Sequence, residues 1–369
     1  MRTVTSPMYR TSSHATTVLQ PQPSSAHCTH AIQSSMNSLI IWRKAPAPPL
    51  ARHSCRAQWH TVSRRNFTRS SFLRREHDPR IKALGREISD DYAIIREKYE
   101  TPKYPIVLAH GLFGFAELRL SSYFPAVEYW HGIRDALTAQ GATVLTPTVP
   151  PSSSIADRAA ALRSALEAHT PALEAVTIVA HSMGGLDARY MLSHLEPLPV
   201  RVAALVTVAT PHRGSAFADY LLDEEVSPLH HYLPRLYHTL EKAGLGTAAF
   251  SQLTRRYMAE EFNPSTPDQP DVRYFSYGAA VEQPALLSPF RHPHAVMMQA
   301  EGPNDGLVSV ESSNWGTYKG TLVGVSHLDL INWSNRVGWT VREWMGIKRN
   351  FNAIAFYLDI ADMLAKEGY

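Results

Sequence analysis

The stretch that most constrains the fold of this chain runs from Val176 to Tyr190 and reads VTIVAHSMGGLDARY. A β-branched run meets Ser182 at a turn and passes directly into a helical pattern. Small residues flank the serine, with Ala180 two positions before it and Gly184 two positions after it. Such a turn strains the backbone of a non-glycine residue, and larger neighbours would collide across the bend. The pattern predicts a serine nucleophile on a strand–turn–helix elbow, and an ordinary β–α turn is the alternative.

Apolar runs typical of buried strands alternate with helical patterns along the chain. We expect strands at 104–109, 142–146, 176–179, 202–209, 272–277 and 320–325. We expect helices at 81–100 (loosely formed), 124–139, 155–169, 183–194, 335–346 and 351–365. This alternation predicts an α/β fold, with a mostly parallel sheet covered by helices on both faces.

Residues 215–265 interrupt this alternation with leucines and tyrosines scattered among charges. The segment is too long for a simple connection and its pattern is helical, so we interpret it as an insertion. Helices inserted over the carboxyl edge of a sheet indicate a lid over a ligand site. The alternative is a pair of packing helices that do not move.

A serine alcohol needs a base to take its proton and a third group to orient that base. At an elbow of this kind the partners follow the serine in the order acid, then histidine. His327 is the last histidine of the chain and lies two residues beyond the predicted strand 320–325. His292 and His294 are its rivals beyond the insertion, in a proline-containing segment without a clear preceding strand. We therefore predict His327 as the base.

Asp305 is the best-placed acid, on a Pro/Gly turn 22 residues before His327. Carboxylates at such positions often only form turns, and that alternative stays open. Asp329 is too close in sequence to the histidine to be the favoured partner. Asp268 and Asp271 lie in a proline-rich loop.

A tetrahedral oxyanion needs backbone donors beside the nucleophile. Met183 offers one N–H at the start of the elbow helix, and Leu112 offers a second from the loop after the strand 104–109. Gly111 and Gly114 flank Leu112 and allow that backbone to approach closely. His181 points away from its neighbour at the elbow and is interpreted as a packing histidine.

Five motifs carry a resemblance to a known family: HGLFG at 110–114, AHSMGG at 180–185, TPHRGS at 210–215, NDGLVS at 304–309 and HLD at 327–329. In this order they resemble the triacylglycerol lipases of the Pseudomonas and Burkholderia type, and still more the fungal mitochondrial relatives of those enzymes. The resemblance covers roughly residues 103–335. It implies an α/β-hydrolase fold, the triad Ser182, Asp305 and His327, and the oxyanion donors Leu112 and Met183.

The resemblance also bears on metal binding. The bacterial lipases hold a structural calcium ion with an aspartate two residues after the catalytic histidine, a position matched here by Asp329. Their glutamine four residues further on is replaced by Trp333, and the segment 276–287, which should carry another ligand, contains no aspartate. A hard cation needs several oxygen ligands. Asp329 is thus a weak calcium candidate, and we expect no cofactor.

Residues 1–75 differ in composition from the rest of the chain. They hold 11 Lys and Arg and no Asp or Glu, and the remainder holds 25 bases against 33 acids. The acidic body argues against a nucleic-acid partner. The Arg- and Ser-rich leader is typical of a mitochondrial transit peptide. A disordered basic tail on a cytosolic or lipid-droplet protein is the alternative.

Within the leader, the apolar run 39–42 is too short to span a membrane. Both cysteines, Cys28 and Cys55, also lie there, so the body can form no disulfide.

These observations predict one α/β-hydrolase domain at about 86–369, which acts on lipid esters at a lipid–water interface through an acyl-Ser182 intermediate. A phospholipase or an acyltransferase with the same triad is the nearer alternative. A catalytically dead lipid-binding protein on this fold is the remote one.

Overall fold

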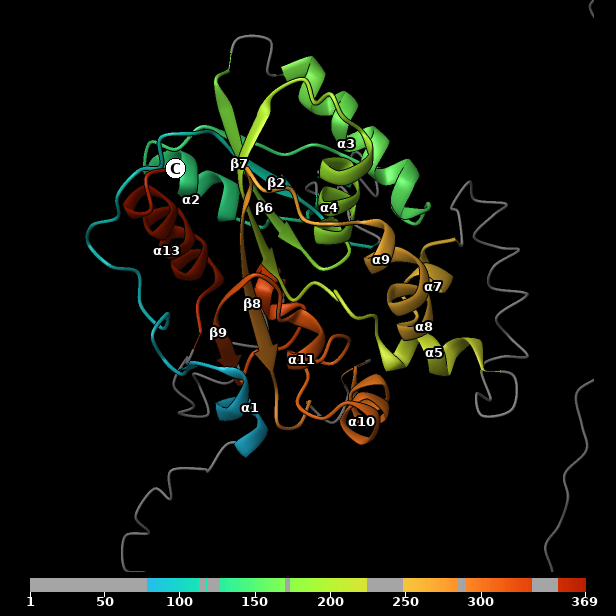
Figure 1. Ribbon diagram of the computed structural model, residues 1–369. Helices are drawn as coiled ribbons and strands as arrows, with labels where there is room; N and C mark the ends of the chain where they lie inside the picture. The colour runs from blue at the N-terminus through green and yellow to red at the C-terminus, as the bar shows by residue number, and fades with distance from the viewer. Residues whose placement is uncertain are drawn as a thin grey trace, which may run out of the picture. The chain divides into compact units, whose positions relative to one another are not determined.

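A parallel β-sheet lies at the centre of the part of the chain that the computed structural model describes (Figure 1). That part consists of residues 78–112, 117–118, 127–169, 173–223, 248–284, 288, 290–333 and 351–369, within the unit Ser71–Tyr369. Across the sheet the strands are β1 (Glu87–Ile88), β9 (Thr317–Val323), β8 (Arg273–Ala280), β7 (Arg201–Val208), β6 (Ala175–His181), β2 (Ile106–Ala109) and β5 (Val144–Leu145). Every neighbouring pair is parallel, which confirms the predicted sheet.

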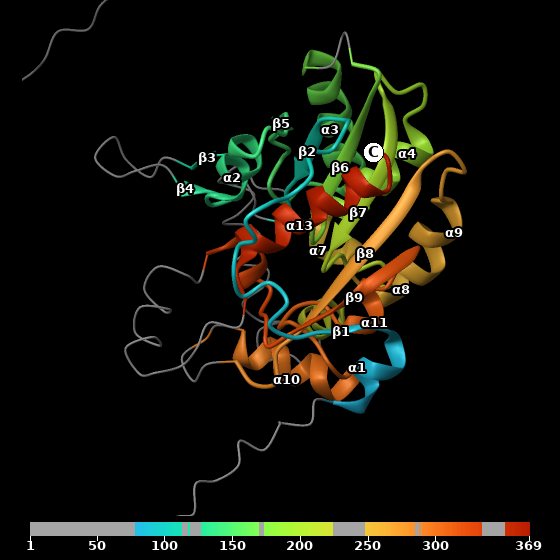
Figure 2. The ribbon, with the colours of Figure 1, turned by 90° about the vertical axis from the view of Figure 1, so that its left-hand side faces the viewer.

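Helices cover both faces of the sheet, as predicted (Figure 2). On one face pack α3 (Ile155–His169) and α4 (Gly184–His194), and on the other α2 (Ile133–Ala139) and α13 (Ala353–Lys366). Alternate side chains of β6 serve the two faces, because Ile178 packs with α3 and α4 whereas Val179 packs with α2 and α13. A strand buried on both sides needs apolar residues at successive positions, hence the continuous apolar runs in the sequence.

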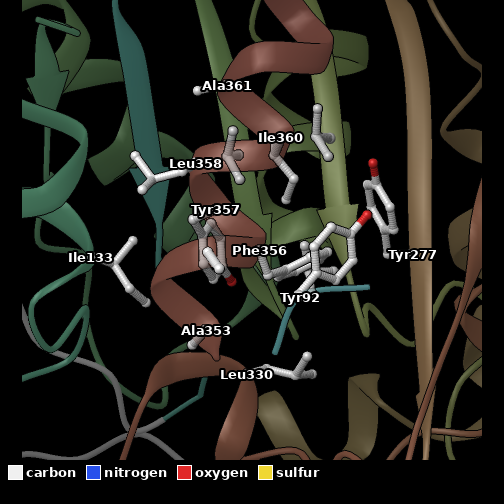
Figure 3. Packing of buried hydrophobic residues seen from close by; sticks show 14 of the residues in the cluster. Tyr92, Ile133, Tyr277, Leu330, Ala353, Phe356, Tyr357, Leu358, Ile360 and Ala361 are labelled. Atoms are coloured by element: carbon white, nitrogen blue, oxygen red, sulfur yellow. The ribbon is translucent and has the colours of Figure 1, made fainter. Parts of the chain in front are cut away.

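Aromatic residues anchor α13 on its face of the sheet (Figure 3). The ring of Phe356 lies 5.2 Å from that of Tyr92 and 5.1 Å from that of Tyr277. Tyr357, on the next position of the helix, packs edge-on against Trp130 at 5.5 Å. The C-terminal helix therefore belongs to the main core.

The order of the strands places a crevice beside β2 and β6. The chain leaves β2 toward β5 on one side, and it leaves β6 toward β7 on the other. At such a switch point the loops after the two strands separate and open a space outside their carboxyl ends. Leu112 follows β2 and Ser182 follows β6, so both candidate residues lie at this crevice.

The prediction of a loose helix at 81–100 is wrong beyond Leu84. The helix α1 (Pro79–Leu84) ends at Gly85, whose positive φ of 138° is outside the range that L residues favour. The chain then forms β1, which extends the sheet at its edge beside β9. A strand of two residues has no periodicity to detect in the sequence.

The helix expected at 124–139 is shorter in the structure and begins at Ile133. Val127–Glu128 forms the strand β4, which pairs antiparallel with β3 (Glu117–Leu118). Gly132, with a φ of 70°, precedes α2 and separates it from the strand. The apolar spacing of 127–132 therefore reflects a strand and a turn.

The described residues of the segment 215–265 are mostly helical, as predicted. It contains α5 (Ala216–Leu222), α7 (Ala248–Gln252), α8 (Arg255–Tyr257), the π-helix η1 (Met258–Phe262) and α9 (Asn263–Ser265). Its motion as a lid stays a prediction. The leader 1–75, Gly114 and the helix expected at 335–346 lie outside the described residues.

Three short helices after β8 were not predicted: α10 (Arg291–Ala300), α11 (Val310–Ser313) and the 3-10 helix η2 (Asp329–Ile331). The helix α10 was not predicted because its sequence contains Pro293. Proline is nevertheless compatible with the first turn of a helix, where the backbone N–H has no intrahelical partner. None of the described helices is long and apolar enough to cross a bilayer.

Candidate active site

Ser182 lies on a strained elbow between β6 and α4. Its φ is +56°, a left-handed value that a non-glycine residue keeps only where the surroundings fix it. Its backbone N–H donates to the carbonyl of Val208 at 3.0 Å. A Cβ at Gly184 would lie 2.6 Å from the carbonyl oxygen of Ala109, so only glycine fits there. The serine thus stands where the sequence predicted an elbow.

Asp305 and His327 meet beside the elbow. Asp305 is fully buried in the segment between β8 and β9, and its Oδ2 lies 2.6 Å from His327 Nδ1. Its Oδ1 accepts hydrogen bonds from the backbone N–H groups of Leu307 at 3.0 Å and Val308 at 2.8 Å. His327 also donates its own backbone N–H to the Asp305 carbonyl at 3.0 Å. The carboxylate therefore has one fixed orientation.

Ser182 and His327 line the same pocket, so the structure brings together the three residues predicted as a triad. Among the described residues, the Ser182 hydroxyl has no hydrogen-bond partner. In structures without substrate, nucleophile and base are often further apart than in the reacting complex.

Two backbone N–H groups beside the elbow have no acceptor among the described residues. Neither Leu112 nor Met183 donates its N–H to an acceptor in the described part of the chain. The loop comes close to the elbow because Gly111 has no side chain: a Cβ there would lie 2.7 Å from the Cβ of Ser182. Both predicted oxyanion donors are therefore available to a ligand.

A buried arginine, which was not predicted, holds the Leu112 loop. Arg158 of α3 donates to the carbonyls of His110 at 2.9 Å and Gly111 at 3.3 Å. Its Nε donates to Asp187 Oδ2 of α4 at 2.9 Å, and both side chains are buried. Burial raises the pKa of Asp187 to about 6, against the opposing effect of Arg158. The ion pair joins the loop to the helix that follows the nucleophile.

Arg158→Met should destabilise the protein by about 3–5 kcal/mol, because it leaves the buried carboxylate of Asp187 without its partner. We also expect turnover to fall, since the loop of Leu112 loses its anchor. Urea unfolding and esterase assays would measure both effects. Arg256→Met is the control, because the Arg256 ion pair with Glu260 is exposed and should contribute less than about 1 kcal/mol. Equal stability of the two variants would contradict the assigned role.

Tyr129 connects the loop to the elbow from the other side. Its hydroxyl accepts the backbone N–H of Gly111 at 3.0 Å and lies 2.7 Å from His181 Nδ1. The buried His181 ring packs against His327, with 4.5 Å between the ring centroids. His181 is therefore a packing residue, as interpreted from the sequence. The role of Tyr129 could not be predicted from the sequence, because the segment 124–139 that contains it was expected to be a helix.

The rival histidines lie elsewhere. His294 Nε2 bonds the carbonyl of Val281 at 2.7 Å, and His292 Nε2 lies 3.2 Å from the hydroxyl of Tyr220. Neither lines the pocket at Ser182. The rival acid Asp268 accepts from the indole of Trp315 at 3.0 Å and does not line the pocket either.

The pocket at Ser182 has a volume of about 380 Å³ and an apolar wall. Its described lining contains no Asp, Glu, Lys or Arg. The apolar wall is formed mainly by the insertion 215–265, by the segment between β8 and β9 that carries Asp305, and by the loop after β9 that carries His327. Its apolar residues are Leu112, Phe217, Leu221, Phe250, Leu253, Phe290, Leu307, Val308, Leu328, Ile331 and Trp333. Such a wall suits a hydrocarbon chain.

The calcium ligands expected from the bacterial pattern do not fit this structure. Oδ2 of Asp329 already accepts hydrogen bonds from the backbone N–H of Ser326 at 2.9 Å and from its hydroxyl at 2.6 Å. The described residues contain no group of three or more His, Cys, Asp and Glu that could hold a metal ion. We therefore assign no step of the chemistry to a metal.

Three buried histidines make stability depend on pH. Burial lowers the pKa of His110 to about 4, and it places the pKa of His181 and His212 well below the ordinary 6.5. The unfolded chain binds protons at these positions first, so stability falls as the pH drops from 6.5 toward 4. Asp187 and Glu301, whose pKa values burial raises, act in the opposite direction. We expect a net slope of about 1–3 kcal/mol per pH unit near pH 5.

His212→Gln would test this origin of the slope. His212 lies outside the pocket, stacked on Trp315 at 5.1 Å and 3.0 Å from the hydroxyl of Thr207. Removing one titrating group should lower the slope by about 1.4 kcal/mol per pH unit. Urea unfolding at several pH values between 4.5 and 6.5 would measure it, and an unchanged slope would contradict the assignment.

Comparisons with known proteins indicate the family and the fold of this chain. A family model described as a PGAP1-like alpha/beta domain matches residues 128–244. Triacylglycerol lipase 2 of Saccharomyces cerevisiae is 33% identical over 332 residues, which cover 77% of this chain and 98% of the yeast protein. A triacylglycerol lipase of Pseudomonas fragi is 27% identical over 303 residues, which cover 72% of this chain and 97% of that protein.

Two solved structures share the fold. The lipase of Staphylococcus hyicus superposes with a TM-score of 0.51 at 19% identity, covering 73% of this chain and 98% of that one. The metagenomic carboxyl esterase MGS0156 superposes with a TM-score of 0.54 at 19% identity, covering 74% of this chain and 79% of that one. Together with the parallel sheet and its helices, these matches confirm the predicted α/β-hydrolase fold. Because the identity to the yeast enzyme extends over almost all of that enzyme, the chain belongs to the triacylglycerol lipase family.

Proposed function

We propose that this protein releases fatty acids from triacylglycerols. The observation that carries the proposal is the pocket at Ser182, whose apolar wall suits an acyl chain and whose described lining bears no charged Lys, Arg, Asp or Glu. An ester group at Ser182 would then have its hydrocarbon chain against leucine and phenylalanine side chains. The names of the yeast and Pseudomonas fragi relatives give the same substrate class.

In the proposed mechanism Ser182 is the nucleophile. Its Oγ attacks the carbonyl carbon of the ester while His327 Nε2 takes its proton. The oxygen of the tetrahedral intermediate accepts hydrogen bonds from the N–H groups of Leu112 and Met183. His327 then protonates the leaving alcohol, and an acyl-Ser182 ester remains. Water, deprotonated by His327, attacks that ester and releases the fatty acid.

The proposed role of Asp305 follows from its contacts. The Asp305 carboxylate accepts a hydrogen bond from the N–H at Nδ1 of His327. With the proton on Nδ1, Nε2 has the free lone pair that a base needs. The negative charge also stabilises the imidazolium that forms in each half-reaction. Both oxygens of Asp305 are hydrogen bonded, and the ring therefore keeps one orientation.

Lipid profiling of the purified protein would test the substrate. We expect fatty-acid release from emulsified triacylglycerol, with diacylglycerol as product and further substrate, and little release from phosphatidylcholine. A phospholipid headgroup would bring its phosphate to a pocket whose described lining has no Lys or Arg to bind it. Faster release from phospholipid, or acyl transfer to an added alcohol in preference to water, would support the other enzyme classes. No labelling of Ser182 by a fluorophosphonate would indicate a binding protein.

We further propose that residues 1–75 direct the protein to mitochondria. The support is compositional: 11 basic residues, no acidic residue and many serines. A fluorescent protein fused to residues 1–75 should enter mitochondria and lose the leader, whereas a fusion to 76–369 should stay in the cytosol. Cytosolic or lipid-droplet fluorescence of the first fusion would contradict this proposal and leave the enzymatic one unaffected.

A further inference from the structure

A compact turn surrounds His327 in the chain. Its first residue, Ser326, donates its backbone N–H to Oδ2 of its fourth residue, Asp329, at 2.9 Å. The Ser326 hydroxyl donates to the same oxygen at 2.6 Å, and the backbone N–H of Asp329 donates back to the Ser326 carbonyl at 3.0 Å. A carboxylate that reaches back three residues to a backbone N–H makes the same contact as the acid of a capping box, and here that carboxylate belongs to the first residue of η2. We call this arrangement the 326–329 turn.

The 326–329 turn holds the backbone on both sides of the histidine. Ahead of it, Gly324 donates its N–H to the carbonyl of Ala280 at 2.7 Å, with a left-handed φ of 77°. Beyond it, Asn332 donates its side-chain amide to the carbonyl of His131 at 2.8 Å. Between these two attachments Val325, Leu330 and Ile331 are buried in the core, and His327 contacts Asp305 and the ring of His181. The hydrogen bonds of the 326–329 turn fix the backbone directly on either side of His327.

The position of the His327 ring needs both supports. The contact of Nδ1 with Asp305 fixes one edge of the ring, but a backbone free to shift would let the ring pivot about that contact. The opposite nitrogen, Nε2, would then move relative to Ser182. Misplacement of a reacting group by about 1 Å can cost roughly 100-fold in rate.

We propose that Asp329 is a positioning residue for His327, which acts through Ser326 to fix the base loop without a divalent cation. The carboxylate does with two internal hydrogen bonds what a metal ligand would do by coordination. This inference rests on the proposed role of His327 as the base. It extends that role to a residue that touches neither the substrate nor the reacting atoms.

The test is steady-state kinetics of the full-length protein on p-nitrophenyl butyrate, with and without EDTA. Asp329→Ala should lower kcat about 10- to 100-fold and leave KM within about threefold. Asp329→Glu should recover most of the loss, because glutamate is the common acid of capping boxes. The rate of Ser182 labelling by a fluorophosphonate should follow kcat across the variants. EDTA should leave the wild-type rate unchanged.

Controls separate this inference from the proposed function. His327→Ala is the reference: if it keeps its activity, the proposed triad is wrong. If His327→Ala is inactive and Asp329→Ala has the wild-type kcat, the triad stands and the inference is wrong. Loss of wild-type activity in EDTA with recovery in CaCl₂ would also overturn it, because Asp329 would then be a metal ligand.

If Asp329→Ala does not fold, a milder variant still tests the inference. Ser326→Ala keeps the backbone bond to Asp329 and removes only the hydroxyl bond. We expect a three- to tenfold lower kcat with an unchanged Tm. An unchanged kcat in that variant would contradict the inference. Asp271→Ala, at an exposed position, should match the wild type in every measurement.

Discussion

Ser182→Ala should abolish turnover, with kcat lower by about 10⁴- to 10⁶-fold on any ester that the wild-type protein cleaves. The variant removes the hydroxyl of a residue that lines the pocket next to Leu112 and Met183, whose N–H groups have no acceptor in the described part of the chain. Alanine keeps the left-handed backbone of this position about as well as serine does. The free energy of unfolding should therefore change by less than about 1 kcal/mol.

Besides the activity assay, this test needs fluorophosphonate labelling to detect the nucleophile and an unfolding curve to check that the variant is folded. The wild type should label at one site, and Ser182→Ala should remain unlabelled with the same Tm. Ser89→Ala is a suitable control, since Ser89 is exposed in the loop after β1. Residual activity above one per cent in Ser182→Ala would remove the serine from the mechanism.

Asp305→Asn should lower kcat about 10⁴-fold while the protein stays folded. The asparagine carbonyl can still accept the N–H groups of Leu307 and Val308, which turns its amide nitrogen toward His327. An amide N–H at that position needs an acceptor, so the neutral ring would place its proton on Nε2. The base would then have no lone pair for the serine proton.

The kinetic signature distinguishes this effect from general damage. The kcat of Asp305→Asn should rise with pH, as hydroxide takes over from the base, and KM should change little. Asp271→Asn changes a carboxylate at an exposed turn and should behave as wild type. A normal kcat in Asp305→Asn would mean that the turn-forming role of Asp305, left open by the sequence, is its only one.

The sequence was sufficient for the elements whose pattern is long and local. The helix at 155–169 was predicted with its observed bounds, and the strand ending in the elbow was found because β-branched residues fill both faces of β6. Order along the chain then paired Asp305 with His327. The two residues are in contact because each lies in a segment that follows a strand of one parallel sheet.

Features that depend on contacts distant in sequence were missed. Arg158 has the sequence environment of a surface arginine on an Ala- and Leu-rich helix, and only the fold shows that it is buried against Asp187. β1 is two residues long and exists because β9 offers an open edge. Tyr129 follows a segment whose apolar spacing is helical, although part of it pairs as a strand.

The strand order places the active-site residues in two regions of the sheet, one away from the edge strand β1 and one close to it. Ser182 and Leu112 follow β6 and β2, which have neighbours on both sides. Asp305 and His327 flank β9, which only the two-residue β1 separates from the edge of the sheet. Mild heating should fray that edge first and separate the base from a nucleophile still in place. Esterase activity should then disappear at a lower temperature than the far-ultraviolet circular dichroism, and should return on cooling.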